Sequence, residues 1–521
     1  MMKKLPLGIQ TFSEMIGKQY LYVDKTREIE RLLDAGKYIF LARPRRFGKS
    51  LLVSTLKELF SGNKELFNGL YIYNKLDWQA HPVIHLDFSK ISYHTLEAFH
   101  TSLSMFLQAT AETFGVTLIG KFVKDQFAEL IQKLAQTAQK QVVVLIDEYD
   151  KPIVDYIEDQ ETAQNNRNIL RDFYGVLKGS DPYLHFVFLT GVSKFSRVSI
   201  FSGLNNLRDL TLSAQFGTLA GYTQEELERD FAGYLDQFAE NTPQSREELL
   251  HKIRTWYNGY SWNGRDRVYN PFSILNLFAE QRFSNYWFAT GTPTFLINLI
   301  KRLQIDPTEF EQKTVSELIF ESYNLENMDV FALLVQTGYL TITGIEGTEE
   351  RLYTLNYPNN EVKKAFMTYL LQGFTVNRLD EVQSTVQQLR QCLRHKDIEG
   401  FITIIRAMFA KIPYPLHIPQ EAYYHSLFYM ILELMGVEVD LEVLTDKGRI
   451  DGVMELPDTI YLIEFKYGAA GANMETLTDD AIRQIRTKRY AERFLNDPRK
   501  RILLGVGFIE KTIGYKIEYA L

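Results

Sequence analysis

Residues 38–60 read YIFLARPRRFGKSLLVSTLKELF and join an apolar run, a loop that ends in Gly48-Lys49-Ser50, and a helix-forming segment. A phosphate-binding loop needs these parts in this order, because backbone N–H groups of the loop and of the helix start face the anion. Lys49 has the length to reach the β- and γ-phosphates of a nucleotide, and the Ser50 hydroxyl is suited to bind Mg²⁺. The loop residues that we expect to bind the nucleotide are Arg45, Arg46, Phe47, Gly48, Lys49 and Ser50.

A second stretch, VVVLIDEYD at residues 142–150, supplies the acids that such a loop requires. An aliphatic run followed directly by carboxylates is typical of a buried parallel strand with acids at its carboxyl end. We expect Asp147 to complete the Mg²⁺ shell with Ser50. Glu148 is the candidate catalytic residue that orients or deprotonates the attacking water. Together the two stretches predict ATP and Mg²⁺ as cofactors.

Strand-like and helix-like segments alternate through the first part of the chain. We expect strands at residues 38–42, 83–88, 142–146 and 184–192, with helices such as 98–113 and 125–140 between them. This alternation predicts an α/β fold in which a parallel sheet is covered by helices on both faces. Ser193 and Lys194 follow the fourth strand and are candidates for sensing the γ-phosphate; an ordinary turn is the alternative.

The loop departs from the usual phosphate-loop pattern at its start. Arg43 stands where the pattern G-x-x-x-x-G-K-[ST] has its first glycine, and Pro44 removes a backbone donor. Arg45 and Arg46 either face phosphate or pair with the acids Asp147, Glu148 and Asp150, and the sequence leaves both interpretations open. We expect this departure from the pattern to affect the rate of ATP hydrolysis more than it affects nucleotide binding.

Length and composition limit the class of protein. A chain of 521 residues predicts three domains, which we place at residues 1–220, 221–375 and 376–521. The middle domain is expected to be helical, with a possible winged helix. A single cysteine, Cys392, and no apolar signal sequence predict a cytoplasmic protein without a membrane partner. The net charge of −7 disfavours nucleic-acid binding over the whole surface but not in one local groove.

A second group of chemistry-bearing residues lies near the C-terminus. GRID at residues 448–451 and IEFK at residues 463–466 flank a turn, so we expect a β-hairpin that brings Asp451 opposite Glu464 and Lys466. Asp451 and Glu464 have the oxygen ligands that Mg²⁺ or Mn²⁺ prefers, and Lys466 would stabilise developing charge. The alternative is a surface strand with a charged face.

Two flanking segments extend this group. Glu421 opens an apolar helix upstream and would complete the metal shell, while His425, one turn later, is equally suited to a plain hydrogen bond. Downstream, residues 483–501 contain eight lysines or arginines and two acids. We expect the basic helix from Arg483 to Arg501 to bind the phosphate backbone of DNA or RNA, with a solvated helix face as the alternative. Gln484 and Tyr490 are further candidates for this site.

Both groups resemble known families. The stretches YLYVDKT, RPRRFGKS, VVVLIDEYDKPI and FLTGVSKFSRVSIFSGLNNL resemble the AAA-ATPase-like family, which is related to the archaeal-type and STAND ATPases. GRID, IEFK and AIRQIRTKRY resemble the PD-(D/E)XK nuclease-like domain that this family often carries at its C-terminus. The resemblance implies a P-loop ATPase, a lid domain and a nuclease-like α/β domain.

Two functions remain open at this point. The first is an ATP-regulated, metal-dependent nuclease with catalytic residues Glu148, Asp451, Glu464 and Lys466. The second is a nucleotide-switched binding or signalling module whose nuclease-like domain is inactive. A homo-oligomer is possible in either case.

Overall fold

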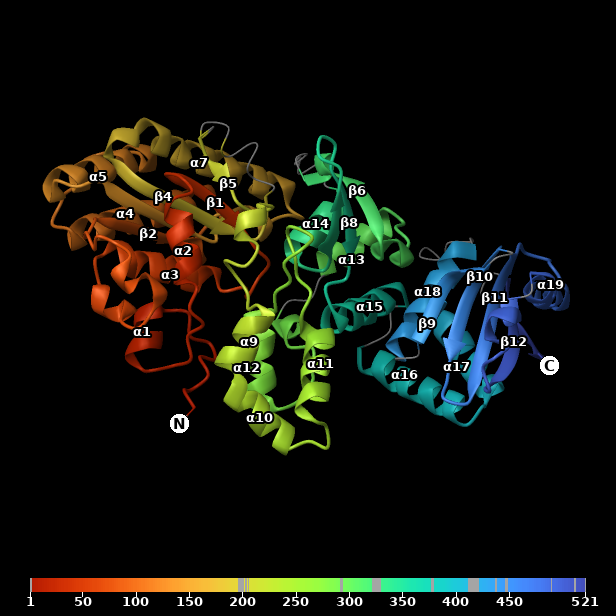
Figure 1. Cartoon of the computed structure of the whole chain (residues 1–521). Helices are drawn as coiled ribbons and strands as arrows, with labels where there is room; N and C mark the ends of the chain where they lie inside the picture. Colours follow the sequence, from red (N-terminus) through yellow and green to blue (C-terminus); the bar gives the residue numbers. More distant parts are fainter. Residues whose placement is uncertain are drawn as a thin grey trace. The chain divides into compact units, whose positions relative to one another are not determined.

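Figure 1 shows the computed structural model of the chain. It describes residues 2–194, 201, 204, 206–290, 294–320, 329–375, 379–410, 421–435, 438–445, 448–488, 490–509 and 512–520; for some of these, including 421–425 and 438–451, only the backbone is described. The chain forms two compact units. The first comprises residues 1–290 and 312–362, and the second comprises residues 291–311 and 363–521. The three predicted domain boundaries stay a prediction.

A five-stranded parallel sheet of order β2-β3-β4-β1-β5 lies at the centre of the first unit. Its strands are β1 (Tyr38–Ala42), β2 (Val83–Asp87), β3 (Val142–Asp147), β4 (Leu184–Gly191) and β5 (Arg208–Asp209). The register places Ala42 beside Gly191 and Asp87 beside Asp147. The carboxyl ends of the strands therefore share one edge, where the predicted loop and acids follow.

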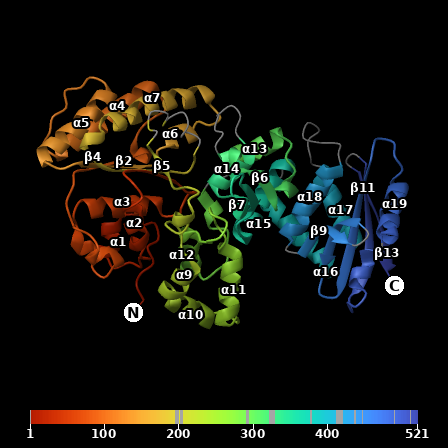
Figure 2. The same ribbon diagram turned by 45° about the horizontal axis from the view of Figure 1, so that its top comes forward.

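Helices cover both faces of this sheet, because successive side chains of a strand point to opposite faces. Tyr38 and Phe40 belong to one buried cluster with α4, α5 and α7, whereas Ile39 and Leu41 belong to another with α1, α2 and α3. Figure 2 shows these two helical layers with the strands between them. The helices are α1 (Phe12–Gly17), α2 (Thr26–Leu33), α3 (Lys49–Phe60), α4 (Leu96–Thr113), α5 (Val123–Ala138), α6 (Lys151–Val154) and α7 (Gln160–Gly179). The predicted α/β architecture is confirmed.

A helical group and a small antiparallel sheet complete the first unit. The helices are α9 (Gln224–Asp230), α10 (Ala232–Glu240), α11 (Arg246–Tyr257), α12 (Pro271–Glu280) and α14 (Val330–Thr337). The sheet has the order β6-β8-β7, with β6 (Lys313–Ser316), β7 (Thr341–Glu346) and β8 (Leu352–Asn356). Thr223 and Glu226 form a capping box at the start of α9, and Gly338 ends α14 with φ of 90°.

The second unit is built on a mixed sheet of order β13-β12-β11-β10-β9. The strands are β9 (Glu438–Thr445), β10 (Gly448–Glu455), β11 (Thr459–Gly468), β12 (Lys500–Ile509) and β13 (Thr512–Ala520). Its helices are α13 (Thr294–Arg302), α16 (Leu379–Arg394), α17 (Ile398–Ala410), α18 (Glu421–Leu434) and α19 (Met474–Thr487). β10 and β11 form the expected antiparallel hairpin, whereas β11 and β12 are parallel and α19 connects them.

One helix belongs to both units. α15 (Asn360–Thr375) begins in the first unit and continues in the second, since the division falls after residue 362. Among the described residues, no helix combines the length and the apolar character needed to cross a membrane.

Candidate active sites

The phosphate-type loop lies between β1 and α3. Gly48 is the residue before the helix and has φ of 82°, and Arg46 has φ of 70°. A left-handed conformation at Gly48 costs little because glycine lacks a Cβ. The turn brings Lys49 to the first position of α3, where the helix N-terminus favours an anion.

Lys49, Ser50 and Asp147 meet where β3 ends beside the loop. The Lys49 ammonium is buried and donates to the carbonyls of Arg43 and Pro44 at 3.0 and 2.9 Å. Burial lowers the pKa of Lys49, while the charge of Asp147 opposes this change. Burial also raises the pKa of Asp147, against a hydrogen bond with Ser50 and the charge of Lys49. The carboxylate oxygens of Asp147 and the hydroxyl oxygen of Ser50 are suitable ligands for Mg²⁺.

Glu148 follows Asp147 and is half-buried. Its backbone has φ of 51°, and its N–H donates to Asp147 Oδ1 at 3.0 Å. Burial raises the pKa of Glu148, while the charge of Lys151, 3.9 Å away, opposes the rise. A carboxylate with a raised pKa at the edge of a pocket has the properties of a general base.

Asp150, the last acid of the 142–150 stretch, holds the ends of β3 and β4 together. Its Oδ2 accepts hydrogen bonds from the backbone N–H and the hydroxyl of Ser193, both at 2.6 Å, and from the N–H of Val192 at 3.1 Å. The next candidate, Lys194, forms an ion pair of 2.9 Å with Asp209. Ser193 and Lys194 thus have described partners in the protein, and their role as phosphate sensors stays a prediction.

The side chain of Arg43 is buried beneath the phosphate-type loop. Its side chain is 1% exposed, and its guanidinium donates to the carbonyls of Ala42, Thr211 and Phe216, each at 2.9 Å. It also stacks on the ring of Trp262 at 4.0 Å. Burial lowers the pKa of Arg43 to about 9, so the side chain remains charged near neutral pH. The residue at the first glycine position is therefore part of the core beneath the loop.

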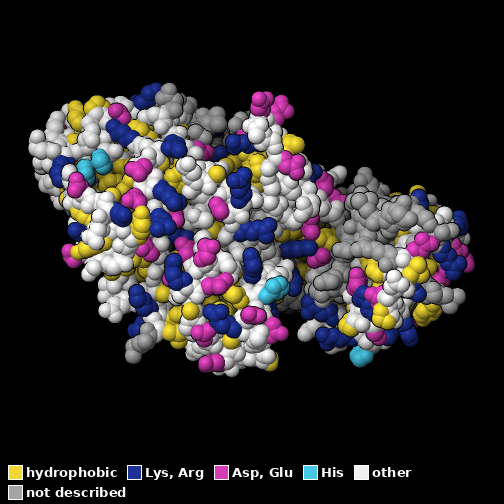
Figure 3. All heavy atoms as spheres, in the orientation of Figure 1, with side chains coloured by type: hydrophobic (Ala, Val, Ile, Leu, Met, Phe, Trp, Pro, Cys, Tyr) yellow, Lys and Arg dark blue, Asp and Glu magenta, His cyan; other side chains and the backbone are white. Residues whose placement is uncertain are grey.

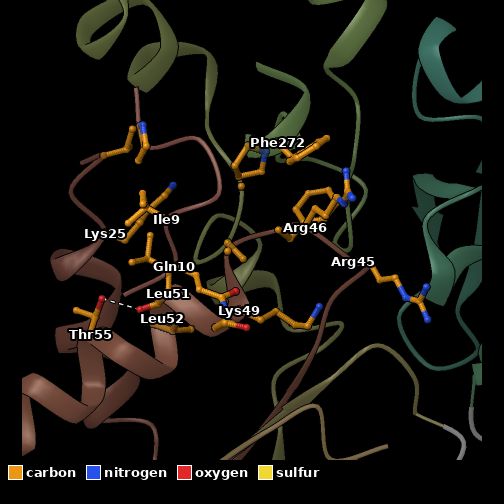
Figure 4. A pocket seen from close by; sticks show the side chains of 18 of the residues that line it. Ile9, Gln10, Lys25, Arg45, Arg46, Lys49, Leu51, Leu52, Thr55 and Phe272 are labelled. Carbon is orange, nitrogen blue, oxygen red and sulfur yellow. Dashed lines mark hydrogen bonds between the residues drawn. The ribbon is translucent and has the colours of Figure 1, made fainter. Parts of the chain in front are cut away.

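Arg45 and Arg46 differ in their surroundings. Figure 4 shows Arg45 extending away from Lys49, whereas Arg46 lies against Phe272. The guanidinium of Arg46 is 3.7 Å from the centre of the Phe272 ring. Among the described residues, no ion pair joins Arg45 or Arg46 to Asp147, Glu148 or Asp150, which were the acids considered as structural partners.

A pocket of about 520 Å³ opens beside the loop (Figure 4). The loop from Arg45 to Leu52 and the acids Glu148 and Asp150 line one part of it. Apolar side chains line another part and come from the N-terminal segment, α1, α2, the segment before α9, and α12: Ile9, Met15, Leu21, Val23, Ile29, Leu219, Ala220 and Leu275. A charged part beside an apolar part is suited to a nucleotide, whose phosphates and base need different surroundings.

Several residues of this pocket are not evident from the sequence. Lys25 lines it and forms an ion pair of 2.6 Å with Glu226, both largely buried. Phe272 and Gln10 also line it. Lys25 and Gln10 lie upstream of β1 and Phe272 far downstream, so no local spacing links them to the loop. The charged Lys25 within YLYVDKT was the available signal.

In the second unit, Glu464 is the central polar residue of the hairpin. Its side chain is fully buried, and Oε1 accepts from Lys466 at 3.2 Å and from the amide of Gln484 on α19. Lys466 remains partly exposed. Leu462, on the same face of β11, packs with Ile482 and Ile485 of α19. An apolar helix–sheet contact therefore positions Gln484 and Glu464 together.

Asp451 and Glu421 have only their backbones described. Gly452 pairs with Ile463, so the residues next to them in sequence, Asp451 and Glu464, lie at the same end of the hairpin. Glu421 is the first residue of α18, and the side chains of Glu421, His425 and Asp451 lie outside the described part. Within that part, no group of three His, Cys, Asp or Glu side chains is arranged to hold a metal ion.

The basic segment is not one helix, contrary to expectation. α19 ends at Thr487, a short 3₁₀ turn spans Tyr490–Phe494, and β12 begins at Lys500. The chain turns here because Tyr490 returns to the core, where it is buried with Ile482 and Ile485. Several cations have acidic partners: Arg483 with Asp480, Arg486 with Glu518, and Arg499 with Glu455 and Asp497. Figure 3 likewise shows basic and acidic side chains interspersed over the visible face.

Comparison with known proteins identifies the family. Residues 6–201 match the family described as Predicted AAA-ATPase, and residues 419–518 match the PD-(D/E)XK nuclease superfamily. An uncharacterized protein in the vnfD 5′ region of Azotobacter chroococcum mcd 1 is 37% identical over 99% of both chains. The chain belongs to the AAA-ATPase-like family. Its second unit carries a PD-(D/E)XK nuclease superfamily domain.

Two solved structures give weaker matches to this AAA-ATPase-like protein. They contain Drosophila ORC bound to Cdc6 and to poly(dA/dT) DNA or GC-rich DNA. The identities are 12% and 13%, with TM-scores of 0.27 and 0.26. The matches cover 72% and 82% of this chain but only 54% and 63% of those chains.

We predict that Arg43→Ala destabilises the first unit, because it leaves three buried carbonyls without their donor and removes the stacking on Trp262. The free energy of unfolding should fall by about 3 kcal/mol. The matched change Arg45→Ala, at an exposed position, should alter it by less than about 0.5 kcal/mol. All four tryptophans (78, 256, 262 and 287) lie in the first unit, so tryptophan fluorescence in denaturant reports on this unit alone. Equal unfolding midpoints for the two variants would contradict the structural role of Arg43.

A glycine pair tests the contact between Asp150 and the end of β4. A Cβ at Gly191 would lie 2.2 Å from Asp150 Oδ1, so Gly191→Ala should displace the carboxylate from Ser193 and cost about 2–3 kcal/mol. Gly175, in α7, has no atom within 4 Å of such a Cβ, and Gly175→Ala should stabilise by about 0.5–1 kcal/mol. Tryptophan fluorescence in denaturant again gives the free energy of unfolding of each variant. A Gly191→Ala protein as stable as the wild type would show that the contact between Asp150 and Ser193 does not contribute to stability.

Proposed function

We propose that this protein binds ATP in its first unit and that the nucleotide regulates a metal-dependent nuclease in its second unit, which cleaves phosphodiester bonds of nucleic acid. The observation that carries the proposal is the fully buried carboxylate of Glu464, with Lys466 and Gln484 beside it. Burying a carboxylate in a hairpin is costly unless its charge is used or balanced. The pocket beside the phosphate-type loop in the same chain supports the regulatory part.

In the first unit, each loop residue has a distinct role. The N–H groups of the loop and the Lys49 ammonium would bind the β- and γ-phosphates. Ser50 and Asp147 would hold Mg²⁺, which neutralises charge that develops on the phosphates when bound. Glu148 orients or deprotonates the attacking water from the pocket edge. The apolar part of the pocket would accept the adenine ring.

In the second unit, Asp451, Glu464 and Glu421 would hold a divalent metal ion, Mg²⁺ or Mn²⁺. Such an ion polarises the phosphodiester and lowers the pKa of a bound water. Lys466 stabilises the negative charge that develops on the phosphate, and Gln484 fixes the orientation of the Glu464 carboxylate. The segment from Arg483 to Arg501 would contact the nucleic-acid backbone with the cations that remain accessible.

Regulation is supported by the helix that the units share. The second residue of α15, Glu361, lies in the first unit. Lys363, two residues later, forms ion pairs of 3.0 Å with Glu311 and with Glu433 of α18. α18 also carries Glu421 at its start. A change at the start of α15 would therefore reach the helix that bears a proposed metal ligand.

We predict that the full-length protein cleaves labelled DNA or RNA with Mg²⁺ or Mn²⁺ and that ATP changes the rate. Glu464→Gln and Asp451→Ala should lower cleavage by about a hundredfold or more, because they remove metal ligands, while ATP binding persists. Lys49→Ala should abolish ATP binding and the effect of ATP on cleavage. Single- and double-stranded substrates, compared with and without ATP, identify the substrate.

The matched control is Glu455→Gln, the same change in the same hairpin at a residue paired with Arg499. It should retain cleavage. Cleavage that survives both Glu464→Gln and Asp451→Ala would exclude this nuclease site. Absence of cleavage under every condition, with ATP still bound, would instead favour a nucleotide-switched binding module.

A further inference from the structure

Glu361 is a buried carboxylate that neither proposed reaction uses. Its side chain is 0% exposed, and it opens α15. Oε2 accepts a hydrogen bond from the Ser273 hydroxyl and Oε1 accepts one from the backbone N–H of Trp287, both at 2.8 Å. Burial raises the pKa of Glu361 to about 7 despite these donors. Burying an ionisable group costs free energy, and buried groups with shifted pKa values are frequent at functional sites.

The two elements that Glu361 joins are also the ones that contact the phosphate loop. The indole N–H of Trp287 and the amide of Asn270 donate to the carbonyl of Arg45 at 3.3 and 3.4 Å. Asn270 caps α12 through the N–H groups of Phe272 and Ser273. Glu361 thus ties the start of α12 to the turn at Trp287, with the Arg45–Arg46 segment between them.

Arg46 and Glu361 interact electrostatically. The charge of Arg46 lowers the pKa of Glu361, and the charge of Glu361 raises that of Arg46 against the effect of burial. The guanidinium rests on Phe272, and its Nη1 is buried without a hydrogen-bond acceptor among the described residues. Arg46 and Phe272 line the same pocket as Lys49 (Figure 4). A guanidinium that lines a pocket can bind a phosphate oxygen, because its N–H groups form charge-assisted hydrogen bonds with phosphate.

We propose that Glu361 is a positioning residue of the nucleotide site: it holds Phe272 and Trp287 against the phosphate loop, so that the guanidinium of Arg46 is placed to bind a nucleotide phosphate. This inference rests on the proposed binding of ATP and names two residues that determine its strength. Arg46 is the binding residue, and Glu361 acts through it.

The charges give this arrangement a pH dependence with a defined sign. A phosphate beside Arg46 adds negative charge and competes with Glu361 for the guanidinium, so the pKa of Glu361 is higher in the complex than in the free protein. Binding therefore takes up protons, and affinity rises as the pH falls through the neutral range. The other titratable groups facing Glu361 are Tyr257, Tyr260 and Tyr286, whose pKa values are raised above their ordinary value, so they stay neutral there.

The test measures the affinity of the full-length protein for fluorescent N-methylanthraniloyl-ATP between about pH 6 and about pH 8. In the wild type the affinity should fall as the pH rises, by up to roughly tenfold for each unit of pKa shift at Glu361. Glu361→Gln is neutral at every pH, so it should lose this component of the pH dependence and keep an affinity close to that of the wild type at the low-pH end. The control Glu280→Gln, the same change at an exposed position of α12, should match the wild type. Titration of the nucleotide's own phosphate is common to all proteins and cancels in the comparison.

A second variant decides the case if Glu361→Gln fails to fold, as judged by tryptophan fluorescence. Arg46→Gln, at a half-buried position, should weaken binding and flatten the pH profile, because it removes the cation that links Glu361 to the phosphate. The inference would be overturned if both variants had the affinity and the pH profile of the wild type. If Glu361→Gln is unfolded, the same result in Arg46→Gln alone would overturn it. ATP binding would remain established in either case. A wild type that binds no nucleotide would overturn the proposed function instead.

Discussion

Parallel pairing of β1, β3 and β4 is the constraint on which the first unit depends. Because these strands are buried on both faces, nearly all of their side chains are apolar, and the polar ones, such as His185 and Thr190 of β4 and Asp147 of β3, lie near the strand ends. Parallel strands end at one edge, so the loop after β1, the acids after β3 and Ser193 after β4 are brought together. The core and the candidate nucleotide site therefore follow from the same register, and one cannot change without the other.

Buried charge serves two different purposes in this unit. Arg43 and Asp150 have their hydrogen-bonding capacity met largely by backbone groups of neighbouring segments, so they fix the edge on which the site is built. Lys49 and Asp147 are also buried, and burial is the main cause of their pKa shifts. Lys49 lines the pocket and Asp147 lies beside Ser50, so both are placed to interact with a ligand, whereas the carboxylate of Asp150, although it also lines the pocket, is bonded to Val192 and Ser193.

The sequence predicted the features that local pattern controls. Aliphatic runs such as 142–146 can hardly be anything but buried strands, and Gly48, Thr223 and Gly338 mark helix ends by their own chemistry. It did not reveal what Arg43 contacts, because Thr211 and Phe216 lie far along the chain. Glu361 was missed for the same reason, since it bonds to Ser273 and Trp287 across a long sequence separation. The assignment of residues 291–311 to the second unit also rests on distant contacts, such as the ion pair of Glu311 with Lys363.

These distant contacts bear on how one unit can influence the other. The chain passes between the units after residues 290, 311 and 362, and the last passage is a continuous helix. Within the first turn of α15, Glu361 is bonded to elements around the phosphate loop and Lys363 to Glu433 of α18. Coupling between two sites requires an element whose equilibrium both sites bias. Under the regulation proposed above, the first turn of α15 is where we expect such an element, because it carries both the buried carboxylate of Glu361 and the paired ammonium of Lys363.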